Sequence, residues 1–220
     1  NMKKMIFSLA IFIIVNSSFL TNDSQSQWVE MSDGINDGHI SCFTVLGTNI
    51  FAATGGGMVL STNYGSNWIS INNGLTNTWV LSLAVSGTNI FAGTNGNGVY
   101  LSPNNGASWI HTNLNQYILS LAAIGNKIFA GSDNFGVWLT TDNGDNWNQT
   151  TLNNRTVSSL AVNGNNIFAG TTGQGVYLST NNGTLWTQTS LNHRRVRAIA
   201  ISGNNIYPGT DSNGVYLSSN

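Results

Sequence analysis

A repeat of about 39 residues dominates this 220-residue sequence. One copy reads Gly87-Thr-Asn-Ile-Phe-Ala-Gly-Thr94 and continues with Gly98-Val-Tyr-Leu-Ser102. The leading glycines are spaced by 40, 38, 39 and 39 residues, and they are Gly47, Gly87, Gly125, Gly164 and Gly203. Five tryptophans are spaced by 40, 41, 38 and 39 residues, and they are Trp28, Trp68, Trp109, Trp147 and Trp186. Two independent sets of markers share one period, so we predict one structural unit used about five times.

Each unit contains four short apolar or alternating segments separated by turn residues. In the second unit these segments are residues 80–85, 89–94, 98–102 and 108–112. The separators are rich in Gly and Asn, which favour tight turns because both tolerate positive φ. The inner segments are rich in Val, Ile, Leu and Phe, as expected for strands covered on both faces. A period near 40 without helical periodicity predicts an all-β fold, a β-propeller of about five four-stranded antiparallel blades.

The turn before each tryptophan carries a recurring pattern. It reads Ser61-Thr-Asn-Tyr-Gly-Ser-Asn-Trp68 in the first unit and Thr140-Thr-Asp-Asn-Gly-Asp-Asn-Trp147 in the third. The pattern resembles the Asp-box (BNR, sortilin-like) repeat, Ser/Thr-x-Asp-x-Gly-x-x-Trp, of bacterial sialidases, xyloglucanases and sortilin-like propellers. The whole units are also similar to the sensor propellers of two-component regulators. Asp142 keeps the acidic residue, whereas Asn63, Asn104 and Asn181 replace it.

The resemblance implies that these turns are structural and that their tryptophans are packing anchors. The five residues to which this role extends are Trp28, Trp68, Trp109, Trp147 and Trp186. An Asn side chain can bond the backbone amides of such a turn as Asp does. The substitutions at three of the boxes therefore leave the expected fold unchanged.

The amino-terminal segment has the order of a secretory signal. Lys3 and Lys4 precede an apolar run over residues 5–15 and a polar stretch over residues 16–27. We therefore predict a signal peptide and short leader over residues 1–27 and the propeller over residues 28–220. An uncleaved amino-terminal anchor is the alternative. Cleavage would give a protein that is secreted, periplasmic or on the surface of a bacterial cell, without stable membrane insertion.

The register of the repeat leaves two interpretations of ring closure. Residues 28–31 match a fourth strand, whereas the carboxyl end stops after a third strand at residues 214–218. Residues 28–31 could complete the last blade as its fourth strand and close a five-bladed ring, which would remove open sheet edges. The alternative is a fragment of a longer propeller.

Candidate ligand-binding residues stand where the repeats differ. The aligned positions just before the innermost strands hold His39, Trp79, Tyr117, Thr156 and Arg195, and Arg155 stands one position earlier in its unit. We predict a binding site made of His39, Trp79, Tyr117, Arg155 and Arg195, because these side chains would converge at one end of the blades. Aromatic and cationic groups suit a carbohydrate, peptide or protein ligand. Loop positions free to vary are the alternative explanation.

Composition and residue placement argue against several other functions. A net charge of −1 gives no electrostatic basis for nucleic-acid binding. One cysteine and three histidines on separate units predict no metal site and no cofactor. Asp133 and Asp211 occupy equivalent loops two repeats apart, which is a weak basis for a catalytic carboxylate pair. We expect a non-catalytic binding or scaffold module. The alternatives are a fragment of an Asp-box glycoside hydrolase and the sensor propeller of a two-component regulator.

Overall fold

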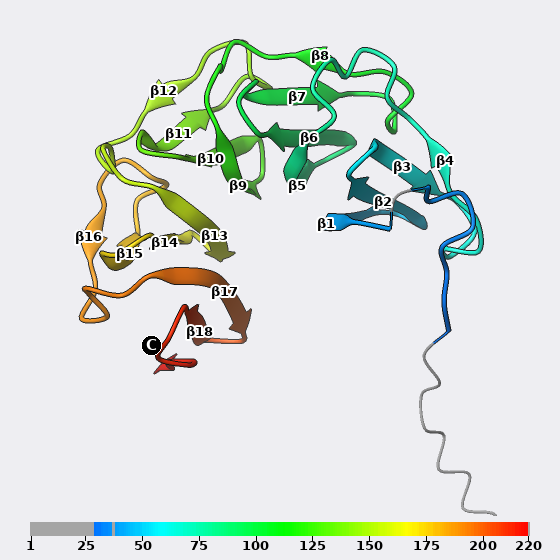
Figure 1. The fold of residues 1–220 in the computed structure, drawn as a ribbon. Helices are drawn as coiled ribbons and strands as arrows, with labels where there is room; N and C mark the ends of the chain where they lie inside the picture. Colours follow the sequence, from blue (N-terminus) through cyan, green and yellow to red (C-terminus); the bar gives the residue numbers. More distant parts are fainter. Residues whose placement is uncertain (1–28, 37, 220) are drawn as a thin grey trace, which may run out of the picture. The chain divides into compact units, whose positions relative to one another are not determined.

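A computed structural model describes residues 29–36 and 38–219, and it shows five antiparallel sheets that follow one another along the chain (Figure 1). The first strands are β1 Ile40–Leu46, β5 Val80–Ser86, β9 Ile118–Ile124, β13 Val157–Asn163 and β17 Val196–Ser202. The second strands are β2 Asn49–Thr54, β6 Asn89–Thr94, β10 Lys127–Ser132, β14 Asn166–Thr171 and β18 Asn205–Thr210. The third strands are β3 Gly57–Ser61, β7 Val99–Ser102, β11 Gly136–Thr140, β15 Gly175–Ser179 and β19 Ser218–Ser219. The fourth strands are β4 Ile69–Ser70, β8 Ile110–His111, β12 Asn148–Gln149 and β16 Thr187–Gln188.

The predicted all-β class and the repeated four-stranded meander are confirmed in the first four sheets. Their strands pair in chain order, as in β5-β6-β7-β8. The fourth strands are only two residues long, shorter than the five residues expected for 108–112. The fifth sheet has three strands among the described residues, in the order β17-β18-β19.

The residues expected to close a ring are only partly described. Trp28 and the predicted signal segment, residues 1–27, lie outside the described residues. Val29, Glu30 and Met31 belong to no strand, and the fifth sheet takes no strand from residues 29–36. The Met31 carbonyl accepts a hydrogen bond from Trp68 Nε1 at 2.9 Å. The Ile71 carbonyl accepts one from Trp109 Nε1 at 2.7 Å, so Met31 occupies the register of Ile71, as the repeat predicts.

The core lies between consecutive sheets. The first strands of neighbouring sheets, such as β5 and β9, lie side by side (Figure 1). One cluster joins Phe51 and Leu60 of the first sheet to Ile90 and Tyr100 of the second. The second strands of the three middle sheets, β6, β10 and β14, are almost wholly buried because both of their faces are covered, which explains their continuous apolar sequence.

The turns with the Asp-box pattern share one geometry. In the third, Thr140 Oγ1 donates to Asp142 Oδ1 at 2.7 Å and accepts from the Gly144 amide at 3.0 Å. Asp142 Oδ1 also accepts from the Asn146 amide at 3.0 Å. The residue before the glycine is left-handed in each turn, at Tyr64, Asn105, Asn143 and Asn182. Asn63, Asn104 and Asn181 make the same bond to the residue four positions on, so an amide replaces the carboxylate without changing the turn.

The repeated tryptophans pack between sheets to different degrees. Trp68, Trp109 and Trp186 are buried, whereas Trp147 is half-buried. Trp147 Nε1 donates to Thr112 Oγ1 at 3.2 Å, and Trp186 Nε1 donates to the carbonyl of Gly183 in its own turn at 3.1 Å. The indoles therefore occupy corresponding places but do not share one hydrogen-bond acceptor.

Candidate ligand-binding edge at the starts of the inner strands

The residues that precede the inner strands occupy equivalent backbone positions. The carbonyl oxygen of each accepts a hydrogen bond from a backbone amide in the hairpin between the second and third strands of the same sheet. The acceptors and their distances to nitrogen are His39 at 3.2 Å, Trp79 at 2.9 Å, Tyr117 at 2.9 Å, Thr156 at 3.0 Å and Arg195 at 3.0 Å. Together with Arg155 we call these residues the inner-strand edge. As the repeat alignment predicts, these backbone hydrogen bonds place the residues at the same end of their sheets.

Arg155 belongs to the adjacent position of the repeat. Its carbonyl accepts from the Gly136 amide of the preceding sheet at 2.8 Å, as the Gln116 and Arg194 carbonyls accept from Gly98 and Gly175. Its Nη1 donates to the Asn154 carbonyl at 2.8 Å. Its Nε is buried without a hydrogen-bond partner. A buried polar atom left unpaired is costly, so an acceptor that reached this guanidinium would be stabilised.

The aromatic members of the inner-strand edge are exposed. Trp79 keeps 59% and Tyr117 keeps 53% of its surface accessible, although large aromatic rings are usually buried. They precede β5 and β9, which lie side by side. The Tyr117 ring covers Gly96 of the preceding hairpin, where an added Cβ would lie 3.2 Å from Cζ. Two accessible rings therefore lie on neighbouring sheets at the same edge.

The cationic end of the edge is held by one carboxylate. Asp211 forms ion pairs with Arg197, at 2.9 Å between Oδ1 and Nε, and with Arg195, at 3.4 Å between Oδ2 and Nη1. The hydrogen bond from Arg197 lowers the pKa of Asp211 below its usual value. All three side chains are exposed, so the pairing orients the guanidinium groups more than it stabilises the fold.

The structure distributes the predicted site residues over all five sheets. It brings Trp79 and Tyr117 onto neighbouring sheets, whereas His39 and Arg195 belong to the first and last sheets. Asp133, in the hairpin beside Tyr117, accepts Thr156 Oγ1 at 2.7 Å. The two carboxylates considered as a catalytic pair, Asp133 and Asp211, are thus each engaged with a different partner.

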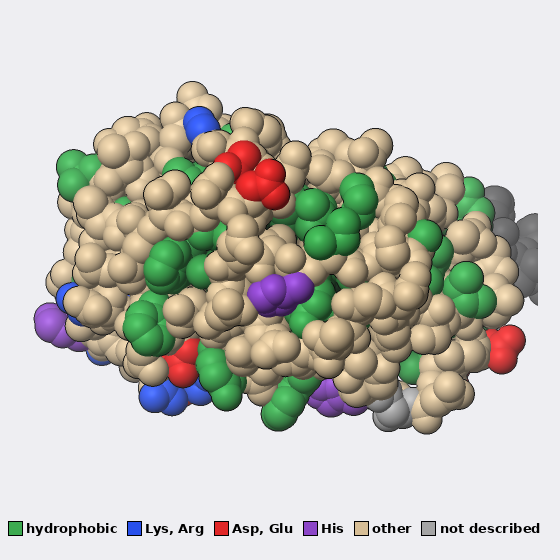
Figure 2. Space-filling view, turned by 90° about the horizontal axis from the view of Figure 1, so that it is seen from above, with side chains coloured by type: hydrophobic (Ala, Val, Ile, Leu, Met, Phe, Trp, Pro, Cys, Tyr) green, Lys and Arg blue, Asp and Glu red, His purple; other side chains and the backbone are tan. Residues whose placement is uncertain are grey.

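Other chemistry is sparse on the described part of the chain. Figure 2 shows one face of the molecule with few charged side chains, separated by neutral polar surface. Within residues 29–36 and 38–219 no three His, Cys, Asp or Glu side chains are grouped as metal ligands. The same residues contain no helix with the length and hydropathy to cross a membrane. Burial raises the pKa of the Cys42 thiol to about 12, so little reactive thiolate forms there near neutral pH.

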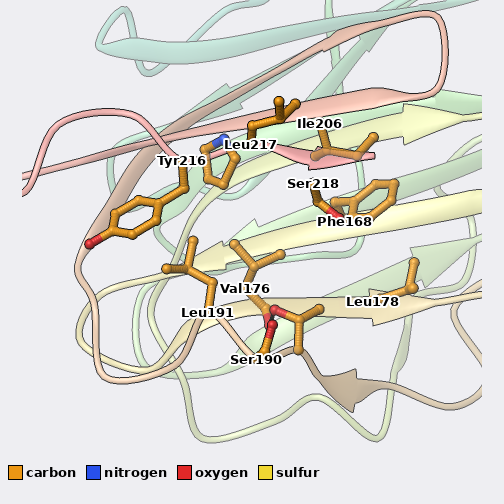
Figure 3. A pocket seen from close by; sticks show the side chains of 11 residues that line it. Phe168, Val176, Leu178, Ser190, Leu191, Ile206, Tyr216, Leu217 and Ser218 are labelled. Atoms are coloured by element: carbon orange, nitrogen blue, oxygen red, sulfur yellow. Dashed lines mark hydrogen bonds between the residues drawn. The ribbon is translucent and has the colours of Figure 1, made fainter. Parts of the chain in front are cut away.

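One cavity was not anticipated from the sequence. It has a volume of about 410 Å³ and lies between the fourth and fifth sheets (Figure 3). Its walls include Phe168, Val176 and Leu191 on one side and Ile206 and Leu217 on the other. No residue of the inner-strand edge lines it.

Comparisons with solved structures agree on the fold. The extracellular domain of the one-component system BT4673 from B. thetaiotaomicron matches with a TM-score of 0.70 and 21% identity, over 82% of this chain and 26% of that one. An ancestral GH74 enzyme matches with a TM-score of 0.70 and 24% identity, over 87% and 31% of the two chains. YCF48 bound to D1 peptide matches with a TM-score of 0.68 and 13% identity, over 84% and 67%.

The chain is a β-propeller module. It spans about a quarter of the length of the BT4673 domain, and the identities show a shared fold alone. No family model matches the sequence, and no curated protein matches it either.

Proposed function

We propose that this chain is a non-catalytic binding module and that its ligand is a peptide held at the inner-strand edge. The observation that carries the proposal is the pair of exposed rings, Trp79 and Tyr117, on neighbouring sheets. Rigid aromatic rings supply large contact areas at low entropic cost. The partly buried Arg155 guanidinium can meet a carbonyl or carboxylate of the same ligand. YCF48, which shares the fold, is described as bound to a peptide.

The absence of catalysis is part of this proposal. A glycosidase needs a carboxylic acid that protonates the leaving group and a carboxylate that acts as base or nucleophile, at a controlled separation. Near the edge, Asp133 accepts a hydrogen bond from the Thr156 hydroxyl, and Asp211 accepts hydrogen bonds from Arg197 and Arg195. The arginines favour the charged form of Asp211 and make it a poor general acid. The four turns with the Asp-box pattern are proposed to be Asp-box turns with a structural role, because their side chains bond their own backbone.

Export is proposed from the amino-terminal sequence, and the likeness to an extracellular domain supports it. Expression in a bacterial host with the full sequence, followed by fractionation and mass determination, tests export and cleavage together. Recovery of the unprocessed chain in the cytoplasm would contradict this part.

A panel of variants screened against peptide and glycan arrays tests the binding site. We expect Trp79→Ala and Tyr117→Ala each to weaken the selected ligand at least about 10-fold, as loss of an aromatic hot spot does. Tyr64→Asn is the matched control, because it removes an exposed ring in a box turn and introduces the residue that stands there in the other repeats. A ligand bound equally well by Trp79→Ala, Tyr117→Ala and Arg195→Ala would place binding elsewhere, and selection of glycans alone would overturn the peptide assignment.

A further inference from the structure

The positive charge of this chain is concentrated beside the inner-strand edge. Two of the seven Lys and Arg residues, Lys3 and Lys4, belong to the amino-terminal segment. Of the other five, Lys127 lies at the opposite end of the third sheet, where it pairs with Ile124. The remaining four are Arg155, Arg194, Arg195 and Arg197. All four lie in or directly after the links that lead into β13 and β17, so a chain with few charges gathers its cations in one region.

Two of these arginines have the same local geometry in consecutive repeats. The backbone carbonyls of Arg155 and Arg194 each accept a hydrogen bond at 2.8 Å from a glycine amide in the hairpin of the preceding sheet. Arg155 Nη1 donates to the Asn154 carbonyl at 2.8 Å, and Arg194 Nη1 donates to the His193 carbonyl at 3.4 Å. Asn154 and His193 are both left-handed, with φ of 50° and 52°. The same turn therefore orients both guanidinium groups, which we call the arginine pair.

Among the described residues, no carboxylate forms an ion pair with the arginine pair. Asp211 is engaged by two other arginines. Asp133 lies in the hairpin that is bonded to the Arg155 carbonyl, but its Oδ1 accepts from the Thr156 hydroxyl. Arg155 Nε is buried without a partner, and Arg155 Nη2 is accessible and bonds no described residue. A partly desolvated guanidinium without a counter-ion favours a carboxylate ligand, because charge-assisted hydrogen bonds are the stronger ones.

Exposed aromatic rings adjoin the arginine pair. Phe135 is 48% exposed and directly precedes the glycine that donates to the Arg155 carbonyl. In the same hairpin, the Asp133 amide donates to the Tyr117 carbonyl at 2.9 Å. The hairpin therefore lies between Tyr117 and Arg155, and Trp79 stands one sheet further on. The second, third and fourth sheets each have a described sheet on either side, and the rings remain exposed there (Figure 1).

We propose that the peptide bound at the inner-strand edge is an acidic segment of another polypeptide, with carboxylates at the arginine pair and an apolar side chain against Trp79 and Tyr117. This inference rests on the function proposed above, since it names the chemistry of the same ligand. Packed sheets lie ~10 Å apart and an extended chain rises ~3.3 Å per residue. Two carboxylates roughly three residues apart can therefore meet both arginines, with the apolar residue at a similar distance on the side of Tyr117.

A synthetic acidic peptide is the probe. It consists of two tyrosines followed by six glutamates, carries a fluorescent label, and is titrated with the full chain while its anisotropy is measured. The run of glutamates lets both arginines find a carboxylate without a fixed register. We expect binding at least about 10-fold weaker when glutamines replace the glutamates, and also when glycines replace the tyrosines. Raising sodium chloride from about 0.05 M to about 0.5 M should weaken the glutamate peptide by a similar factor, because salt screens exposed charges.

Substitutions copied from the repeat locate the site. Arg155→Gln and Arg194→Gln introduce the residue that Gln116 supplies at the equivalent backbone position, so the turn should be kept. Lys127→Gln is the matched control, since it removes the same charge at the other end of the third sheet. We expect the variant with both arginines replaced to bind the glutamate peptide at least about 10-fold more weakly, and Lys127→Gln to change the affinity less than about twofold. Urea denaturation verifies that all the variants fold.

The outcomes separate this inference from the proposed function. A peptide that depends on Trp79 and Tyr117 but binds the double arginine variant unchanged would keep the proposed function and overturn the acidic ligand. Failure of every peptide, acidic or neutral, would overturn both. A glutamate peptide that needs the arginine pair but is indifferent to Trp79→Ala and Tyr117→Ala would place the anion site apart from the rings, against this inference. Equal competition by a short single-stranded DNA would indicate a site for polyanions in general and overturn the assignment to an acidic peptide.

Discussion

The second strands of the fourth and fifth sheets have nearly the same sequence, yet their surroundings differ. Asn-Ile-Phe-Ala-Gly-Thr forms β14, and Asn-Ile-Tyr-Pro-Gly-Thr forms β18. The fourth sheet continues into its turn with the Asp-box pattern (a box turn), Trp186 and β16. The segment from the end of β16 to Leu191, here called the return segment, follows. In the fifth sheet the described residues end with β19. The consequence is visible in burial, because Phe168 and Thr171 are buried, whereas the equivalent Tyr207 and Thr210 are only partly so.

The comparison separates two roles within one repeat. Three strands are enough to form the meander, since β17, β18 and β19 pair in the same register as their counterparts. The turn, the tryptophan and the return segment then seal the contact with the preceding sheet and cover the hairpin. The largest effects of substitution should therefore occur where the indole and the return segment are present.

Replacing Trp109 with Ala should have the largest effect on stability. Trp109 is only 3% exposed and packs between the first two sheets, so its removal leaves a cavity in a filled contact. We expect a loss of about 3–5 kcal/mol in the free energy of unfolding, measured by urea denaturation. Trp79→Ala, at an exposed ring, is the control and should change it by less than about 1 kcal/mol. A loss below that value for Trp109 would show that the indole does not seal the contact.

A pair of glycines measures the contribution of the return segment. Gly136 and Gly214 occupy the same hairpin position, with φ of 73° and 72°. A Cβ on Gly136 would lie 1.9 Å from the Leu152 carbonyl oxygen, whereas a Cβ on Gly214 would meet nothing within 4 Å. Gly214→Ala should cost about 1–2 kcal/mol, from the left-handed backbone alone. Gly136→Ala should cost clearly more in the same denaturation assay, and equal losses would mean that the return segment moves aside freely.

Much of this architecture is predictable from the sequence because it depends on local patterns. The period, the apolar second strands and the Gly-Asn turns predict the strand order that β5 to β8 show. The cavity could not be predicted in this way, because it arises where one repeat meets another. Its walls include Phe168 and Ile206, which are 38 residues apart in the sequence and belong to different repeats.

The candidate edge was predictable in position but not in detail. The alignment predicts that Trp79 and Tyr117 start inner strands, and the backbone hydrogen bonds place them there. It could not predict that Arg195 shares Asp211 with Arg197 or that the Nε of Arg155 is buried. These features depend on side-chain rotamers and on packing between repeats, which a one-dimensional pattern does not encode.

The box turns differ in one titratable group, which gives a smaller, pH-dependent effect. Hydrogen bonds from Asn146 and Thr140 lower the pKa of Asp142 from 3.8 to about 2. A carboxyl whose folded pKa is depressed stabilises the fold above its unfolded pKa and loses that contribution as pH falls toward the folded pKa. Between about pH 4 and pH 2 the wild type should therefore lose stability more steeply than Asp142→Asn, which copies the other three turns. Superimposable melting temperatures across this window would contradict the lowered pKa.

The smallest effect on stability, but a sharp test of the comparison, concerns one thiol position. Cys42 on β1 corresponds to Ser82 and Ser159, which are buried in middle sheets, and to Ala198, which is exposed on β17. With a pKa of about 12, only about 10⁻⁴ of the Cys42 thiol is ionised at pH 8, and the thiolate is the reactive form. Native Cys42 should react slowly with a thiol reagent such as dithionitrobenzoate and quickly once urea unfolds the chain.

Moving the thiol along the repeat completes that test. In a Cys42→Ser background, Ala198→Cys places a thiol at the same register of the fifth sheet. Among the described residues, no further sheet follows the fifth to cover this position. An exposed thiol has a pKa near 8.5, so its thiolate fraction at pH 8 is about 10³-fold higher than that of Cys42. We expect the native-state reaction rate to rise strongly, although by less than the ratio of thiolate fractions because a less basic thiolate is a weaker nucleophile, while the free energy of unfolding barely changes. A slow reaction at position 198 would mean that another element covers the fifth sheet in solution, and the contrast between the two sheets would then disappear.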